Sequence, residues 1–196
     1  MKVYLIRHGQ TDGNVQGIHQ GWGNSSLTER GRAQAGALAE VMQGKRFDRI
    51  ICSDLLRTRQ TCSIVFGDSA TVEYDARLRE INNSVIGGRS RNELFGIYGD
   101  AYLDDCHRLD FARYGGESSQ SLLDRTADFL DSLTHDTASK NVAVVSHGGT
   151  IRAIIAGVLG MPLNTLRMAI DNCSVTGLEY SGDGWRLVFL NNKKEI

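Results

Sequence analysis

Two histidines in this chain each follow directly after a short apolar run. The first run, residues 3–6, leads into Arg7 and His8, and the second, residues 141–146, leads into His147. A neutral histidine is a nucleophile toward phosphorus, and guanidinium groups match phosphate oxygens with paired hydrogen bonds. One such strand end could equally be a solvated cap, but two are hard to obtain from packing demands alone. The pair therefore predicts a phosphate site at the carboxyl ends of two strands.

Further polar candidates accompany the two histidines. Arg57 falls near the start of a predicted helix, where the positive end of the helix dipole attracts anions. Gly148 opens another predicted helix, so its backbone N–H group can face an anion. Glu80 could protonate a leaving alcohol and later activate water. A glutamate beside Arg77 and Arg79 could equally be a solvated carboxylate, so the residue types leave its role open.

Metal-ion catalysis is the competing mechanism for reactions of phosphate esters. The chain has no HxxxH, HExxH, DxD or P-loop pattern, and arginines near His8 and His147 would repel a metal ion. We therefore expect no metal and no other cofactor.

Composition narrows the class of protein. The chain has 196 residues, long enough for one domain with a sizeable core, and we expect a single domain over residues 1–196. Its 22 basic and 23 acidic residues give a net charge of −1, which favours neither nucleic acid nor a membrane surface as a partner. No apolar run approaches the ~20 residues of a membrane span.

Cysteine usage and the start of the chain bear on the compartment. The four cysteines are widely spaced and form no C-x-x-C pattern, which favours free thiols in a reducing compartment. The chain also begins with a predicted strand rather than a leader peptide. We expect a cytoplasmic protein, and the sequence leaves its oligomeric state open.

The apolar periodicity predicts alternating strands and helices, and hence an α/β fold. Predicted strands cover residues 3–6, 47–52, 71–74, 141–146, 173–180 and 185–190, the last two as a hairpin. Predicted helices cover about 28–44, 54–66, 115–135 and 148–160, the first two with Thr28 and Ser53 as N-caps. Residues 12–26 and 78–91 are predicted loops, residues 92–111 two short helices broken near Gly99, and residues 193–196 a frayed tail.

Several segments occur in an order that resembles one known family. These are LIRHGQT, Asn14, QGWGNSSLTERGRAQA, SDLLRTRQT, LRE, GES and VVSHGGTIR. Together they resemble the histidine phosphatase (phosphoglycerate mutase-like) superfamily from Val3 to about Tyr180. The resemblance implies a three-layer α/β/α sandwich around a mostly parallel sheet, which agrees with the predicted elements.

The resemblance also implies roles for particular residues. His8 would be the phosphorylated nucleophile and Glu80 the proton donor. The phosphate pocket and the substrate side would be formed by Arg7, Arg57, His147, Asn14, Gln20 and Gly21.

The chain departs from the family pattern just after Glu80. The family often has a glycine, a tryptophan and an acidic residue before a second glycine, whereas this chain has Ser84, Ile86 and Gly87 ahead of Gly88. The departure falls in a predicted cap or insertion region at about 82–116, which would shape the mouth of the site.

Three functions remain open. We favour a phosphoric monoester hydrolase of the histidine acid phosphatase type that acts on a small phosphorylated metabolite through a phosphohistidine. A cofactor-dependent phosphoglycerate mutase would use the same chemistry. Mutases that resemble this family are usually longer after the glutamate segment and at the C-terminus, so hydrolysis is preferred. A non-catalytic phospholigand-binding module is the third possibility.

Overall fold

The structure, a computed structural model, describes residues 1–193 and is built on one six-stranded sheet. The strands are β1 (Lys2–Arg7), β2 (Arg49–Cys52), β3 (Glu73–Tyr74), β4 (Asn141–Ser146), β5 (Val175–Ser181) and β6 (Gly184–Asn192). The α-helices are α1 (Asp12–Val15), α2 (Glu29–Met42), α3 (Leu56–Phe66), α4 (Arg91–Tyr98), α5 (Asp100–Arg108), α6 (Ser119–Thr134) and α7 (Gly148–Leu159). Short 3-10 turns lie at Ala76–Leu78, Ser84–Ile86, Ala112–Tyr114 and Leu163–Thr165.

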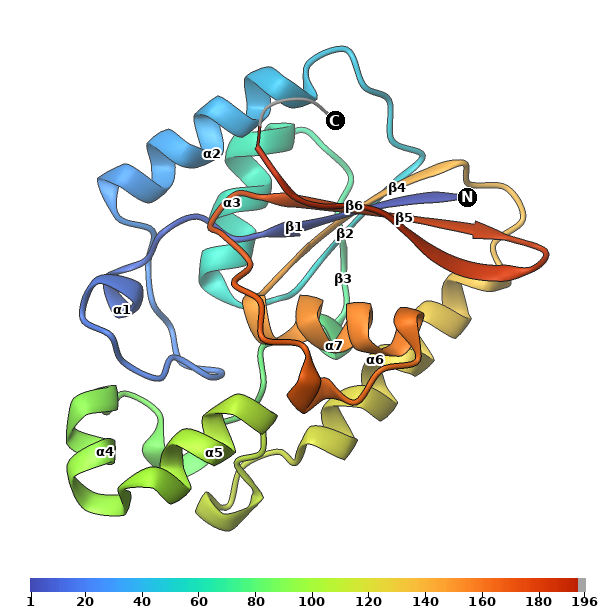
Figure 1. The fold of residues 1–196 in the computed structure, drawn as a ribbon. Coiled ribbons are helices and arrows are strands. Elements are labelled where there is room, and N and C mark those ends of the chain that lie inside the picture. Colours follow the sequence, from blue (N-terminus) through green and yellow to red (C-terminus); the bar gives the residue numbers. More distant parts are fainter. Residues whose placement is uncertain (194–196) are drawn as a thin grey trace.

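The sheet has the strand order β3-β2-β4-β1-β5-β6. Its first four strands run parallel, and β5 and β6 form an antiparallel hairpin added beside β1. In the parallel pair of β1 and β4, Arg7 lies opposite Ser146. His8 and His147 therefore leave the sheet side by side. Figure 1 shows α1, α4 and α5 beyond this end of the sheet, away from the chain's N-terminus.

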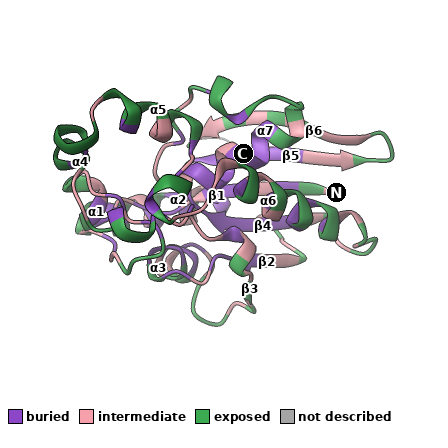
Figure 2. Ribbon diagram, turned by 90° about the horizontal axis from the view of Figure 1, so that it is seen from below, coloured by how far each residue is buried: buried purple, intermediate pink, exposed green. Residues whose placement is uncertain are grey.

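Helices cover both faces of the sheet, and the side chains of β1 alternate between them. Val3 and Leu5 join a core cluster that includes residues of α6 and α7, whereas Ile6 joins a second cluster with residues of α2 and α3. All three are fully buried, as Figure 2 shows for the central strands. Burial of each aliphatic side chain contributes about 1.5–3 kcal/mol, so strands covered on both faces need apolar residues at successive positions.

The predicted fold class, a three-layer α/β/α sandwich, is confirmed. The C-terminal hairpin and the two short helices broken at Gly99 also form as predicted. Thr28 is the N-cap of α2, and its side chain accepts a hydrogen bond from the Gly31 N–H group.

Several local predictions were wrong. The helix expected from residue 115 begins at Ser119, with Ser118 as its N-cap, and the strand expected over residues 71–74 forms only at Glu73–Tyr74. The helix expected from residue 54 begins at Leu56, and Ser53 does not cap it. The predicted loop 12–26 contains the single-turn helix α1, because Thr11 and Asn14 satisfy each other's backbone N–H groups as a capping box.

The four cysteines are free thiols. Lys193 forms an ion pair with Asp171 at 2.7 Å, and the rest of the predicted tail lies outside the described residues. Among residues 1–193, no helix is long and apolar enough to cross a membrane.

Candidate active site

A cavity of about 810 Å³ opens where β1 and β4 end. Eight of the nine residues predicted for the site contribute to its wall: Arg7, His8, Asn14, Gln20, Gly21, Arg57, Glu80 and Gly148. The ninth, His147, is fully buried and its ring packs edge-on against that of His8, with 5.2 Å between the ring centroids. The fold therefore gathers residues that are up to 141 positions apart in the sequence around one cavity.

His8 is held in one tautomer. Its Nδ1 atom lies 2.7 Å from the Gly9 carbonyl oxygen, which can only accept a hydrogen bond, so Nδ1 carries the proton and Nε2 keeps a lone pair. Burial lowers the pKa of His8 well below 6.5, and the charges of Arg57 and Arg7 lower it further. Gly9 approaches the backbone of α2 so closely that a Cβ atom would lie 2.5 Å from the Gly31 oxygen. The result is a neutral imidazole in a fixed position.

His147 is engaged with protein groups at both ring nitrogens. Arg57 donates from Nε to His147 Nδ1 at 3.1 Å, which leaves His147 Nε2 to donate to Ser53 Oγ at 2.8 Å. Burial, followed by the charge of Arg57, lowers the pKa of His147 well below 6.5. His147 therefore orients Arg57 from behind the cavity wall rather than forming part of that wall.

The two arginines of the predicted phosphate pocket are largely desolvated. Arg57 also donates to the carbonyl oxygens of Gly21 and Gly23, at 2.8 and 3.0 Å. Burial lowers the pKa of Arg57 to about 10. Arg7 donates to the Ile170 carbonyl oxygen, while its buried Nε has no partner among the described residues. Backbone carbonyl oxygens thus orient the guanidinium groups of Arg7 and Arg57, which keep their positive charge at neutral pH.

Glu80 lies against the first turn of α7. Its carboxylate accepts hydrogen bonds from the Gly149 and Thr150 N–H groups, each at 3.2 Å. The Thr150 hydroxyl donates to the Arg79 carbonyl oxygen at 2.7 Å and so fixes the backbone next to Glu80. The carboxyl group that the sequence left open therefore belongs to the cavity rather than to a solvated turn.

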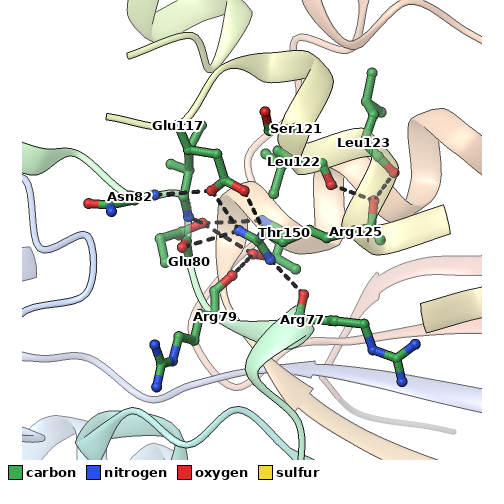
Figure 3. Close-up of polar contacts among 12 residues, drawn as sticks. Arg77, Arg79, Glu80, Asn82, Glu117, Ser121, Leu122, Leu123, Arg125 and Thr150 are labelled. Carbon is green, nitrogen blue, oxygen red and sulfur yellow. Dashed lines mark hydrogen bonds and ion pairs between the residues drawn. The ribbon is translucent and has the colours of Figure 1, made fainter. Parts of the chain in front are cut away.

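A clamp formed by Glu117 and Arg125 holds the backbone on both sides of Glu80 (Figure 3). Arg125 donates to the carbonyl oxygens of Arg77 and Glu80, at 2.6 and 3.2 Å. The same guanidinium pairs with the Glu117 carboxylate in two hydrogen bonds of 2.6 and 3.0 Å. Glu117 in turn accepts from the Asn82 N–H group at 3.2 Å. The segment that carries Glu80 is therefore tied to α6.

On the opposite side, the predicted substrate residues are fixed through their oxygen atoms. Asn14 Oδ1 accepts from the Thr11 N–H group at 3.1 Å, and Gln20 Oε1 accepts from the Thr11 hydroxyl at 2.9 Å. Asn172, which the sequence did not single out, donates to the His8 carbonyl oxygen at 2.9 Å. The NH₂ groups of Asn14 and Gln20 are the donors that these bonds leave for a ligand.

Sequence reasoning missed the residues that hold the site in place. A serine directly before a predicted helix indicates an N-cap, so the sequence gives Ser53 a different role, and Asn172 and Arg125 carry no recognisable pattern of their own. Glu117 lies in the GES segment, whose spacing in the sequence gives no sign of a contact with Arg125. Among residues 1–193, no three His, Cys, Asp or Glu side chains are grouped so that they could hold a metal ion.

Comparisons with known proteins agree with this geometry. The family model "Histidine phosphatase superfamily (branch 1)" matches residues 3–193. The chain belongs to this superfamily. A relative from Erwinia tasmaniensis, named "Probable phosphoglycerate mutase GpmB", is 30% identical over 94% of this chain and 87% of its own length.

Solved structures show the same fold. A putative alpha-ribazole-5'-P phosphatase from Escherichia coli has a TM-score of 0.90 at 28% identity, covering 100% of this chain and 98% of its own. A mycobacterial glucosyl-3-phosphoglycerate phosphatase in complex with VO3 has a TM-score of 0.88 at 31% identity, covering 97% and 98%. Members of the superfamily are phosphatases or mutases, so this chain is related to enzymes of phosphoryl transfer.

The buried histidines make stability depend on pH. His8 and His147 have pKa values well below 6.5, and burial lowers the pKa of His19 to about 4. Below pH 6.5 these three histidines are protonated in the unfolded chain but neutral in the folded protein. Unfolding therefore takes up protons, so the free energy of unfolding falls as the pH falls toward the folded pKa values. We expect a loss of about 1 kcal/mol for each histidine between pH 6.5 and 5.5, measured by urea unfolding. His19→Asn should flatten this slope and the exposed His135→Gln should not; a flat wild-type profile contradicts the prediction.

The clamp formed by Glu117 and Arg125 should stabilise the folded protein. Arg125→Met leaves Glu117 unpaired, and both side chains are largely buried, with 16% and 12% exposed. Because a buried unpaired carboxylate is costly, we expect the free energy of unfolding to fall by about 3 kcal/mol in a denaturant titration. Arg89→Met, which breaks an exposed pair with Glu93, is the control and should cause no measurable change. A double variant with Glu117→Gln should lose less than the sum of the single losses; strict additivity would rule out the coupling.

Proposed function

We propose that this protein hydrolyses small phosphate monoesters through a phosphohistidine on His8, without a metal ion. The observation that supports this most strongly is the tautomer of His8. Its Nδ1 proton is held by the Gly9 carbonyl oxygen, so Nε2 is the atom with a free lone pair on a neutral imidazole. Arg7 and Arg57 lie in the same cavity wall and can hold the oxygens of a phosphate dianion.

The reaction would proceed in two displacements. In the first, His8 Nε2 forms a bond to phosphorus while the bond from phosphorus to the ester oxygen breaks, and Glu80 gives its proton to the leaving alcohol. In the second, water attacks phosphorus, Glu80 takes a proton from that water, and the nitrogen–phosphorus bond breaks to release phosphate. Arg7, Arg57 and the Gly148 N–H group would stabilise the charge on the transferring oxygens in both steps.

The partner would be a small-molecule phosphate ester. Two of the similar structures are described as phosphatases of alpha-ribazole 5'-phosphate and of glucosyl-3-phosphoglycerate, and both of these ligands are small phosphate esters.

We also propose a cytoplasmic location, which the four free thiols support. The name of the Erwinia relative favours one alternative, a mutase in which the phosphoryl group returns to a ligand instead of to water.

Labelling tests the nucleophile. Incubation with ³²P-labelled phenyl phosphate and rapid quenching should give an acid-labile phosphoenzyme, and His8→Ala should abolish both labelling and turnover because it removes Nε2. His135→Ala, at an exposed histidine outside the cavity, should retain both. Turnover by His8→Ala would overturn the proposal, as would activity that is lost on chelation. Isomerisation of 3-phosphoglycerate that depends on 2,3-bisphosphoglycerate would establish the mutase instead.

A substitution next to Glu80 tests the proton donor. A Cβ atom at Gly149 would lie 2.5 Å from Glu80 Oε1, so Gly149→Ala must displace the carboxyl group. We expect kcat for alkyl phosphates to fall about tenfold or more, since a poor leaving group needs a proton, while aryl phosphates with good leaving groups change little.

Gly157→Ala on the same helix is the matched control, because a Cβ atom there meets nothing within 4 Å. Its kinetics should equal those of the wild type, and Glu80→Gln should show the same dependence on the leaving group as Gly149→Ala. Equal falls in kcat for alkyl and aryl phosphates would mean that a group other than Glu80 protonates the leaving group.

A further inference from the structure

Trp22, in the loop between α1 and α2, contacts the segment that carries Glu80. Its indole Nε1–H group donates a hydrogen bond to the Glu80 carbonyl oxygen at 2.7 Å, across 58 positions in the sequence. The cavity wall within residues 1–193 includes Gln20, Gly21 and Glu80 but not Trp22. Trp22 can therefore influence the proposed reaction only through the groups that it holds.

The hydrogen bond from Trp22 falls on the peptide unit that also contacts the Glu80 carboxyl group. A trans peptide unit is planar, and its C=O and N–H groups point in opposite directions. In the unit between Glu80 and Ile81, the carbonyl oxygen accepts from Trp22 at 2.7 Å and from Arg125 at 3.2 Å. The N–H group of the same unit donates to Glu80 Oε1 at 3.1 Å. A rotation of this unit would therefore turn its N–H group away from Oε1 and release the side chain.

This contact does not depend on the protonation state of Glu80. A carboxylate oxygen and the carbonyl oxygen of a carboxylic acid both accept hydrogen bonds. Oε1 can therefore accept from the Ile81 N–H group whether or not Oε2 carries the proton for the leaving alcohol. The Trp22 hydrogen bond is thus available to Glu80 both as the acid and as the base of the proposed mechanism.

Trp22 is itself fixed through its ring and its backbone. The Arg79 guanidinium lies over the indole ring, 4.8 Å from its centroid, as in a cation–π pair. Arg79 Nε in turn donates to Asp54 Oδ1 at 2.7 Å. The residues on either side of Trp22 accept from Arg57 through their carbonyl oxygens, at 2.8 and 3.0 Å. Trp22 therefore connects an arginine of the proposed phosphate pocket to the proposed proton donor.

We propose that Trp22 is a positioning residue for the first displacement, in which its indole N–H group keeps the Glu80 carboxyl group directed at the leaving oxygen. This inference rests on the proposed phosphatase mechanism and adds the group that orients its proton donor. Glu80 still gives its proton to the alcohol as the bond from phosphorus to oxygen breaks, and Trp22 exchanges no proton. A misplaced acid slows the departure of a basic alcohol most, so the contribution of Trp22 should grow with the basicity of the leaving group.

The dependence of the rate on the leaving group tests the proposal. We would measure kcat/KM of Trp22→Phe for 4-nitrophenyl, phenyl, benzyl and ethyl phosphate, because kcat/KM covers the steps up to the loss of the alcohol. Phenylalanine keeps an aromatic ring near Arg79 and removes the N–H donor. The loss of one hydrogen bond should lower kcat/KM about threefold to tenfold for the alkyl esters and leave 4-nitrophenyl phosphate within about twofold of the wild type.

Trp185→Phe is the matched control. It changes the other tryptophan of the chain, which lies in β6 outside the cavity, and should leave kcat/KM unchanged for every ester. Trp22 is 43% exposed, so its replacement should leave the fold intact. Trp22→Leu also removes the ring and should show the same dependence on the leaving group, with a loss at least as large as that of Trp22→Phe.

A double variant shows whether Trp22 acts through Glu80. In the Glu80→Gln background the proton donor is already absent, so Trp22→Phe should cause no further loss that depends on the leaving group.

The outcomes separate the two proposals. If Trp22→Phe slows all esters equally, or if its effect is undiminished in the Glu80→Gln background, Trp22 does not orient the proton donor, while the phosphatase mechanism stands. If the wild-type protein neither turns over these esters nor forms a phosphoenzyme, both proposals are overturned.

Discussion

The site depends on the register between β1 and β4. Their parallel pairing sets Arg7 opposite Ser146, so the next residue of each strand is a histidine at the same edge of the sheet. A shift of one residue would turn the apolar side chains of β1 to the wrong faces and would separate His8 from His147. The two apolar cores on either side of the sheet thus fix the position of the proposed nucleophile. Stability and chemistry rest on the same constraint.

Burial then sets the electrostatics of the site. Burial and the nearby arginines keep His8 neutral, and the Gly9 carbonyl oxygen keeps its proton on Nδ1. The guanidinium groups of Arg57 and Arg7 are held in position because backbone carbonyl oxygens accept hydrogen bonds from them. A neutral nucleophile beside fixed positive charge suits attack on a phosphate dianion, which is the geometry that electrostatic preorganisation requires.

The polar network around Glu80 links that arrangement to the helical layer. The carboxyl group of Glu80 lies against the first turn of α7, and Arg125 and Glu117 clamp the backbone segment around Glu80 to α6. Helix α4 adds Arg91 to the cavity wall, and α7 adds Arg152. One helix, α7, therefore contributes Gly148 to the proposed phosphate site and holds the carboxylate of the proposed proton donor, Glu80.

The sequence by itself determined the α/β fold and most of the elements, because apolar periodicity and strand ends leave local patterns. It also pointed to Arg7, His8, Arg57, Glu80 and His147 by residue type and position, whereas the roles of Gln20 and Gly21 came only from the resemblance to a known family. It misplaced Ser53, since a serine before a helix looks like a cap whether or not its hydroxyl faces His147. It gave no sign of the Arg125 clamp or of the tautomer of His8. Those features are contacts between residues far apart in the chain, and only the tertiary structure decides which donors and acceptors meet.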